Sequence, residues 1–457
     1  MLRSLWLLFI YLGFLGVGTA APFVLALGYV WVDTFRPQEV AYVILDQIPV
    51  ALIMGAAAFG SYILLDRRNP PRLTLPNLLQ MMMCLWCTLT LAWAVSPPEA
   101  WVKWDWAFKT LVFAAFLPWV IRSRVQIEAF VQVYVLTLAA NFIPFGVKTL
   151  ISGGGYGRNL GLASGNSGLA EGGQLSTFCL MAVPIALYLA KHTQLIPRTW
   201  FTTLAYWGIA GLATVTALGT YERSALIGLA VLAIYIFIWS RHKLAMGTVI
   251  VIGVTIALYA TSGLFMKRME TIGQFQTESS ALTRLLVWRW TLDFAMSHPF
   301  GGSFSSYLVN VIQFPPDALN PGGYVQQGRA FHSIYFEVLG ETGWPGLAMF
   351  LLTSVSAMIS LRRTAKRTRS IPHMAWVTDL ANALQSGIAV FLTAGAFVGI
   401  AFQPMFWYFI AVSISLGQYV RRVEALQSPV KLTGWRTAQQ PPILAGPEPA
   451  PAGWRRR

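Results

Sequence analysis

Long apolar runs separated by short basic clusters dominate this chain and limit what it can fold into. Of its 457 residues, 56% are hydrophobic and only 11% are charged, whereas a soluble domain carries about 25% charged residues. A helix needs about 20 mostly apolar residues to cross the hydrocarbon core of a bilayer. We identify such runs at residues 4–32, 42–65, 78–95, 104–121, 126–150, 174–190, 200–219, 222–240, 244–264, 345–361, 378–402 and 404–420. The sequence therefore predicts an all-α polytopic integral membrane protein with about twelve transmembrane helices.

The basic residues predict how these helices are oriented. The net charge is +15, but most Lys and Arg residues stand in short loops between apolar runs, which is how a polytopic protein fixes its orientation. This placement argues against nucleic acid as a partner. If each run crosses once, one side carries all of the main clusters, which are Asp66–Arg68 with Arg72, Arg122 with Arg124, Lys191 with Arg198, Arg241 with Lys243, Arg362–Arg369, and Arg421 with Arg422.

The first run leaves two alternatives open. It is long enough for one tilted helix kinked at Pro22, which places both chain ends on the cytoplasmic side. Two short helices that each cross would instead place the N-terminus outside.

Composition predicts six parts of the chain. They are N-terminal transmembrane helices (1–150), a Gly-rich outer loop (151–173), further transmembrane helices (174–264), a large outer loop before the tenth span (265–344), C-terminal transmembrane helices (345–422) and a proline-rich tail (423–457). We expect the tail to be a disordered cytoplasmic extension. Functional residues concentrate on loops held by a rigid scaffold, so we expect a functional site in the outer loops.

The cysteines predict neither a disulfide framework nor a metal site. Cys84, Cys87 and Cys179 all fall inside apolar runs. Cys84 and Cys87 have CxxC spacing, but they lack a second pair and nearby His, Asp or Glu, so we interpret them as packing residues.

The stretch HSIYFEVLGETGWPG, residues 332–346, departs most clearly from the apolar pattern. Pro345 suits the first turn of a new helix, so we expect a span over 345–361 and a separate short helix over 332–342 at the membrane surface. Glycines at intervals of three, Gly340, Gly343 and Gly346, permit a sharp bend and a close backbone approach.

This bend would hold a histidine at the outer face of the bilayer. Of the five histidines, only His298 and His332 are expected to face outward. His298 precedes Pro299 and ends a helical pattern, so we interpret it as helix-terminal. An unperturbed imidazole titrates near pH ~6.5, so His332 is the outward-facing side chain best suited to accept a proton, and its alternative role is to satisfy a local hydrogen bond.

The segment around His332 resembles a known motif. His332-Ser333, nine intervening residues, Gly343, two more and Gly346 resemble the histidine motif of O-antigen ligases and of the related O-antigen polymerases and protein O-oligosaccharyltransferases. That family places the motif at the end of its large periplasmic loop, as here.

Three further segments are similar to the same family, and the resemblance covers roughly residues 130–420. They are GNSGLAEGG (165–173), TYERSALIG (220–228), and SALTRLLVWRW with its downstream Pro-Phe-Gly-Gly. The first of these has Ser167 and Gly168 where the family commonly has proline and asparagine.

The resemblance implies a GT-C-like membrane glycosyltransferase in the bacterial inner membrane, with a site that faces the periplasm. It would transfer a glycan from undecaprenyl diphosphate to a hydroxyl acceptor such as lipid A core, a glycan or a protein, without metal, nucleotide or other cofactor. His332, Arg284 and Arg223 would be catalytic: the histidine activates the acceptor hydroxyl, and the arginines hold the diphosphate because guanidinium binds phosphate oxygens bidentately. Attack on the anomeric carbon would be direct and inverting.

Four other residues are candidates for substrate binding, namely Arg289, Arg158, Ser333 and Glu341. Arg289 is weaker than Arg284, and Arg158 has a solvated loop charge as its alternative. Glu341 either orients the imidazole or caps the helix at Pro345. Arg223 has a second interpretation as an interfacial anchor.

Other functions remain as alternatives. A polymerase or a protein O-oligosaccharyltransferase would share the donor chemistry and differ in acceptor. A polysaccharide or lipid exporter or flippase would carry ionisable residues deep within its spans, and Asp46 is the clearest such acid in the sequence. A non-catalytic envelope scaffold would make the motif accidental.

Overall fold

The computed structural model describes residues 2–41, 44–66, 68, 70–152, 171–240, 242–244, 247–248, 255, 279–315 and 322–427. The α-helices are α1 (Leu2–Ala20), α2 (Pro22–Phe35), α3 (Pro37–Val40), α4 (Val50–Leu65), α5 (Leu75–Leu89), α6 (Pro97–Val120), α7 (Arg124–Ser152), α8 (Gly172–His192), α9 (Trp200–Gly219), α10 (Arg223–Trp239), α13 (Ser279–Ser297), α14 (Ile334–Thr368), α15 (Ala375–Ala394) and α16 (Pro404–Gln427). Short 3-10 helices are η1 (Thr90–Trp93), η3 (Ser306–Val309), η4 (Pro372–Met374) and η5 (Gly395–Phe397), and the strands are β1 (Val311–Phe314) and β2 (Tyr324–Gln327).

These helices form a polytopic membrane bundle. Seven of the described helices are long and apolar enough to cross a membrane, judged by length and composition, and α2, α4 and α10 are shorter apolar helices. The predicted run 244–264 lies almost wholly outside the described residues, so the expected total of twelve spans stays a prediction. The proline-rich tail lies outside them too, apart from its first residues at the end of α16.

The first apolar run is two helices and not one. Ala21 has non-helical backbone angles, φ −137° and ψ 88°, and Pro22 occupies the first turn of α2. Proline suits that position because its missing N–H has no partner to lose there. The run therefore forms two helices, as the second alternative expected, and the number of times it crosses the membrane stays a prediction.

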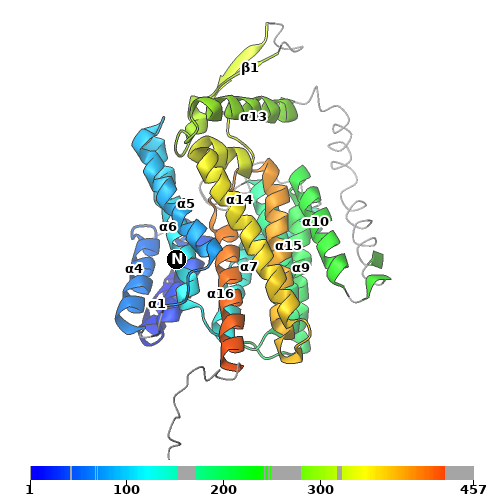
Figure 1. The fold of residues 1–457 in the computed structure, drawn as a ribbon. Helices are drawn as coiled ribbons and strands as arrows, with labels where there is room; N and C mark the ends of the chain where they lie inside the picture. Colours follow the sequence, from blue (N-terminus) through cyan, green and yellow to red (C-terminus); the bar gives the residue numbers. More distant parts are fainter. Residues whose placement is uncertain are drawn as a thin grey trace, which may run out of the picture.

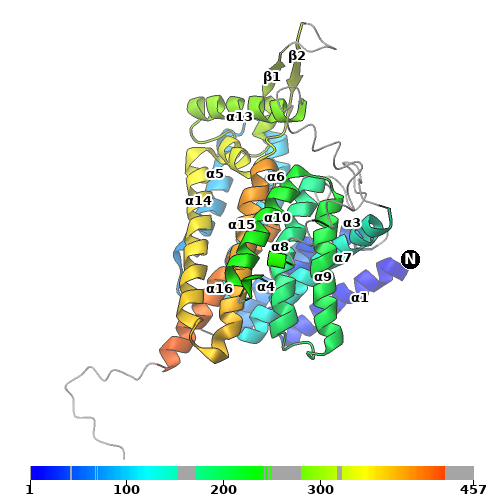
Figure 2. The ribbon, with the colours of Figure 1, turned by 90° about the vertical axis from the view of Figure 1, so that its right-hand side faces the viewer.

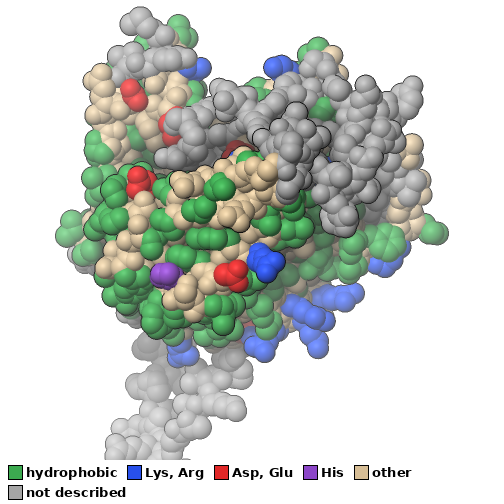
Figure 3. Space-filling view, turned by 90° about the horizontal axis from the view of Figure 1, so that it is seen from above, with side chains coloured by type: hydrophobic (Ala, Val, Ile, Leu, Met, Phe, Trp, Pro, Cys, Tyr) green, Lys and Arg blue, Asp and Glu red, His purple; other side chains and the backbone are tan. Residues whose placement is uncertain are grey.

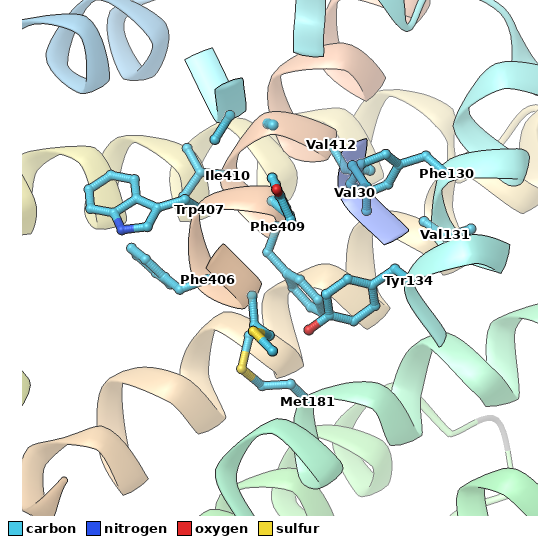
Figure 4. Packing of buried hydrophobic residues seen from close by; sticks show 14 of the residues in the cluster. Val30, Phe130, Val131, Tyr134, Met181, Phe406, Trp407, Phe409, Ile410 and Val412 are labelled. Carbon is cyan, nitrogen blue, oxygen red and sulfur yellow. The ribbon is translucent and has the colours of Figure 1, made fainter. Parts of the chain in front are cut away.

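The C-terminal helix α16 lies in the centre of the core. Its first half, residues 404–416, is largely apolar on all sides, which is typical of a buried helix, and Phe406, Trp407 and Ile410 are fully buried. Figure 4 shows these side chains among residues from neighbouring helices, including Tyr134 of α7 and Met181 of α8. The three cysteines are free and buried, which confirms their interpretation as packing residues.

Four of the six predicted basic clusters meet at one end of the bundle, those of Arg68 and Arg72, of Arg122, of Arg367 and of Arg422. The contacts that join them are Arg422 Nη2 to the Arg122 carbonyl at 2.7 Å, Gln418 Nε2 to the Arg72 carbonyl at 3.2 Å, Arg68 Nη2 to the Val120 carbonyl at 3.5 Å and Arg367 Nη1 to Glu424 at 3.6 Å. Figures 1 and 2 both show α13 and the strands at the opposite end from the last turn of α16. The bundle therefore has an arginine-rich end and, opposite to it, an end covered by α13.

A small β-hairpin stands on the α13 end, and the sequence analysis did not predict it. β1 and β2 pair antiparallel, with Val311 opposite Gln327 and Phe314 opposite Tyr324. Phe314 stacks on Tyr324 with ring centroids 4.6 Å apart. Phe314 and Ile312 join a small separate core with Val287 of α13, so the hairpin is anchored to that helix.

The bend expected in the histidine motif is present. Helix α14 is broken at Gly343, which has φ 67° and ψ −168°, so a short helix precedes the break and a long apolar helix follows it. A Cβ atom at Gly343 would overlap the Pro299 carbonyl oxygen and the Phe300 carbonyl carbon. The backbone of the loop after α13 enters the kink, where Trp344 N donates to the Pro299 carbonyl at 3.0 Å.

We predict that Gly343→Ala destabilises the protein by about 2 kcal/mol or more, because alanine adopts positive φ poorly and its methyl group would overlap the 299–300 backbone. Thermal unfolding of the purified protein in detergent measures this. Gly60→Ala is the matched control: it lies within α4 and a Cβ there meets no atom within 4 Å, so it should be neutral or slightly stabilising. Equal unfolding midpoints for the two variants would contradict the tight backbone contact.

Candidate functional site

His332 has an unusual backbone conformation at the α13 end of the bundle. Its φ is 48°, in the left-handed region, which residues other than glycine adopt at a cost of about 1–3 kcal/mol and retain only where surrounding contacts impose it. It directly precedes Ser333, the N-cap of α14. The backbone therefore turns sharply at His332.

Helix α13 holds this turn. Trp288 Nε1 donates a hydrogen bond to the Phe331 carbonyl at 2.9 Å, and the Trp288 ring stacks on Phe336 with centroids 5.0 Å apart. Phe331 itself is 2% exposed and packs with Val287 in the small core under the hairpin. Phe331 and Phe336, which precede and follow His332 in the sequence, are thus held by α13.

Arg284 lies one helical turn before Trp288. Residues four apart share one face of a helix, so Arg284 stands on the α13 face that contacts the His332 segment, and it is half-buried. Arg289 follows Trp288 directly, points off that face and is exposed. By this spacing Arg284 shares the Trp288 face of α13, and Arg289 does not.

Arg223 begins α10 at the same end of the bundle. Its neighbour Ser224 lies beside the start of α8, because a Cβ at Gly173 would stand 3.6 Å from Ser224 Oγ and 2.9 Å from Val398 Cγ2. Gly399, the residue after Val398, lies close to His332, because a Cβ on Gly399 would stand 3.9 Å from the His332 backbone nitrogen. The turn at 398–399 therefore lies between the starts of α8 and α10 on one side and His332 on the other.

Ser333 and Glu341 are both enclosed by protein. Ser333 is 1% exposed, and its hydroxyl has no hydrogen-bond partner within the described part of the chain. Glu341 is 0% exposed, and its Oε1 accepts hydrogen bonds from Lys103 Nζ at 2.7 Å and from the Ser305 backbone at 3.0 Å. The expected roles of Glu341, orienting the imidazole or capping the helix at Pro345, are wrong, because its carboxylate is bound to α6 and to the loop after α13.

Two charged residues that the sequence analysis missed belong to this region. Lys103 of α6 donates to Glu337 Oε1 at 2.7 Å as well as to Glu341. Glu337 and Glu341 are four residues apart, so they share one face of the short helix before the kink. That four-residue spacing was the signal that the sequence offered for these two glutamates. Nothing in the sequence paired them with Lys103, which lies 234 residues before Glu337.

The other motif residues occupy the places that close packing requires. A Cβ at Gly340 would stand 2.5 Å from the Phe331 ring, and Pro345 lies in the first turn after the kink. His298 follows the last residue of α13, and its backbone N–H bonds to the Phe294 carbonyl at 2.7 Å, which confirms the helix-terminal interpretation. Arg158 and most of the Gly-rich loop lie outside the described residues.

Asp46 is exposed and stands before the first residue of α4, so its interpretation as a buried acid within a span is wrong. Two other carboxylates lie inside the bundle. Buried Glu128 accepts from the backbone of the α8–α9 loop, and half-buried Asp33 accepts from the Tyr408 hydroxyl. These groups have partners of their own inside the bundle.

Figure 3 looks down on the α13 end of the bundle. Hydrophobic and neutral polar atoms make up most of the visible described surface, acidic side chains are few, and most of the visible basic side chains gather at its lower right edge. Within the described ranges, no group of three His, Cys, Asp or Glu side chains is arranged to hold a metal ion. What this end of the bundle offers is an imidazole on a constrained turn, with guanidinium groups on α13 and at the start of α10. Imidazole can accept a proton from a hydroxyl, and guanidinium can bind a diphosphate.

Two protein-family models match different parts of the chain. Residues 208–351 match a family model described as O-antigen ligase, and this region contains Arg223, Arg284, His332 and the kink at Gly343. Residues 2–194 match a family of unknown function, DUF5935. No curated protein matches the chain significantly.

We predict that Trp288→Phe loosens the His332 turn without unfolding the bundle. Phenylalanine keeps a ring over Phe336 but removes the N–H that the Phe331 carbonyl accepts. Losing about 1 kcal/mol of local stability should speed amide hydrogen exchange in a 331–336 peptide roughly fivefold. Trp101→Phe, at an exposed site on α6, should leave that peptide unchanged. Equal exchange in both variants would show that Trp288 does not hold the turn.

Proposed function

We propose that this chain, which belongs to the O-antigen ligase family through residues 208–351, transfers an oligo- or polysaccharide from undecaprenyl diphosphate to a hydroxyl acceptor at the periplasmic face of the bacterial inner membrane. The observation that supports this best is the left-handed turn at His332, imposed by α13 at the same end of the bundle as Arg284 and Arg223. Strain of this kind is retained where a side chain must be held in one place.

The distribution of charge supports the orientation. Arginine-rich loops stay on the cytoplasmic side of polytopic proteins, and the clusters around Arg68, Arg122 and Arg422 meet at the end opposite to α13. The end that carries His332 then faces the periplasm. A lipid-linked donor would reach it from the outer leaflet, with its polyprenyl chain among the apolar helices and its diphosphate at the interface.

The proposed reaction is a single displacement. The acceptor oxygen forms a bond to the anomeric carbon of the donor sugar while the bond from that carbon to the diphosphate oxygen breaks. The proton of the acceptor hydroxyl passes to the neutral His332 imidazole, and the bonding electron pair leaves with the lipid diphosphate. Attack from the face opposite the leaving group inverts the anomeric configuration.

Arg284 and Arg223 would stabilise the departing diphosphate. Negative charge grows on its oxygens as the glycosidic bond breaks, and cations fixed in advance where charge develops usually contribute the largest electrostatic share of catalysis. Both side chains start from helical positions, on α13 and at the first residue of α10. Helical attachment fixes their separation better than loop attachment would.

We predict that His332→Ala lowers glycan transfer by at least about 100-fold, the contribution expected of a general base. The assay follows transfer from an undecaprenyl-diphosphate glycan by the protein in proteoliposomes. Arg284→Ala should lower transfer to a similar extent.

His298→Ala and Arg329→Ala are the matched controls, since both replace exposed side chains at the same end of the bundle. Full transfer by the His332 variant, with normal membrane insertion, would remove His332 from the mechanism.

Transfer should also be insensitive to chelators, because hydroxyl activation and diphosphate stabilisation are assigned to imidazole and guanidinium. We expect the initial rate in excess EDTA to equal the rate with added Mg²⁺. Loss of activity in EDTA that Mg²⁺ or Mn²⁺ restores would contradict the arginine mechanism.

The acceptor distinguishes a ligase from the related polymerases and protein O-oligosaccharyltransferases, and each acceptor is offered alone. Transfer to lipid A core would identify a ligase, and transfer to a lipid-linked glycan would identify a polymerase. Transfer to a peptide carrying Ser, Thr or Tyr would identify a protein O-oligosaccharyltransferase. An exporter would move the glycan without forming a new glycosidic bond, so linkage analysis of the product distinguishes it from all three.

A further inference from the structure

We propose that Trp86, Trp93 and Lys103, which lie within the region matched to a family of unknown function, position the His332 segment of the O-antigen ligase region. This inference rests on the proposed function. It assigns a role to the N-terminal region: to complete a site whose reactive side chains all come from the C-terminal region.

Two tryptophans of residues 86–103 bind the backbone at the kink. Trp86 Nε1 donates to the Thr342 carbonyl at 2.8 Å, and Trp93 Nε1 donates to the Gly301 carbonyl at 3.1 Å. Phe300 lies against both indoles, with ring centroids 5.9 Å and 6.4 Å away. Carbonyl groups beside a helix break lose their helical partners and need others when buried. The N-terminal region supplies those donors.

The backbone of the same segment extends this contact. Val95 N donates to the Gly302 carbonyl at 3.0 Å, and Thr90 Oγ1 lies 3.3 Å from Ser303 Oγ. Gly302 N in turn donates to the Gly340 carbonyl at 2.9 Å. The loop after α13 is thus held between the N-terminal region on one side and the kinked helix α14 on the other.

Lys103 makes the charged part of the connection. Its ammonium group lies 2.7 Å from both Glu337 and Glu341, and the rings of Phe304 and Phe402 face it at 5.9 Å and 5.5 Å. Two carboxylates this well buried would repel one another without a shared cation. Lys103 therefore allows both acids to stay in place.

Each glutamate also accepts a hydrogen bond from the backbone of a loop near the site. Glu337 Oε2 accepts from the Ala401 backbone at 2.9 Å, and Glu341 Oε1 accepts from the Ser305 backbone at 3.0 Å. A Cβ at Gly399 would stand 3.6 Å from Glu337 Oε2 and 3.9 Å from the His332 nitrogen. Lys103 is thus linked to the His332 backbone through Glu337 and the 399–401 turn.

The test compares Lys103→Met and Trp86→Phe with two controls on α6, Lys109→Met and Trp101→Phe. Lys109 pairs with Asp105 at an exposed site, and Trp101 is 55% exposed. Both readouts use the full-length protein: hydrogen exchange of peptides covering 299–306 and 331–345, and kcat and KM for the lipid-linked donor.

We expect faster exchange in both peptides for Lys103→Met and Trp86→Phe, and a kcat at least about tenfold lower with the donor KM within about twofold, because a misplaced base affects the transition state more than donor binding. Lys103→Arg should recover part of kcat. The α6 controls should match the wild type in both readouts.

Unchanged exchange and kcat in Lys103→Met would overturn the proposal for Lys103, and the same result in Trp86→Phe would overturn it for the kink. If the Lys103→Met variant fails to insert into the membrane, the Trp86→Phe variant still tests the proposal, because this substitution removes one hydrogen bond and no charge. A wild-type protein without transfer activity would refute the proposed function instead, while the exchange data would still report on positioning.

Discussion

Gly301 and Gly343 meet backbone to backbone, with φ of 79° and 67°, and this contact is what the arrangement of the site depends on. Gly343 breaks α14, so the apolar part of that helix can run along the side of the bundle while its first two turns lie under α13 (Figure 2). Gly301 lets the loop after α13 enter the break. A Cβ on either residue would overlap the backbone of the other segment. Without this approach, the turn at His332 and the helix bearing Trp288 would not face one another.

Charge is distributed along the bundle in a way that matches its environment. At the arginine-rich end, guanidinium groups bond to carbonyls of the α6–α7 junction and to exposed acids. At the α13 end, buried charge is concentrated in Lys103 and the two glutamates that it binds, Glu337 and Glu341. Burial of charge is unfavourable unless partners are close, so this cluster holds the segments around it in one arrangement. The two ends thus serve different purposes, one setting orientation and the other fixing a geometry.

Local features were predictable from sequence, and contacts between distant segments were not. Three glycines at intervals of three with Pro345 predicted the bend, because backbone freedom and helix starts depend on neighbouring residues alone. Hydropathy predicted most helices for the same reason. Trp288 and Lys103 contact the site across 43 and 234 residues of sequence, and no periodicity encodes such pairing. The family resemblance pointed to His332 and Arg284 but carried no information on the N-terminal region, where it matches only in hydropathy. The interpretation of Asp46 was wrong because this residue lies within an apolar run of the sequence but outside the helix, since α4 begins only after Pro49.

The most direct test of the central claim is an experimental structure of the protein in lipid nanodiscs with an undecaprenyl-diphosphate glycan bound. We predict that the diphosphate lies within hydrogen-bonding distance of the Arg284 and Arg223 guanidinium groups, with the His332 imidazole facing the anomeric carbon on the side away from the diphosphate. A donor bound at the arginine-rich end, or His332 and the two arginines lying on separate surfaces, would contradict the account.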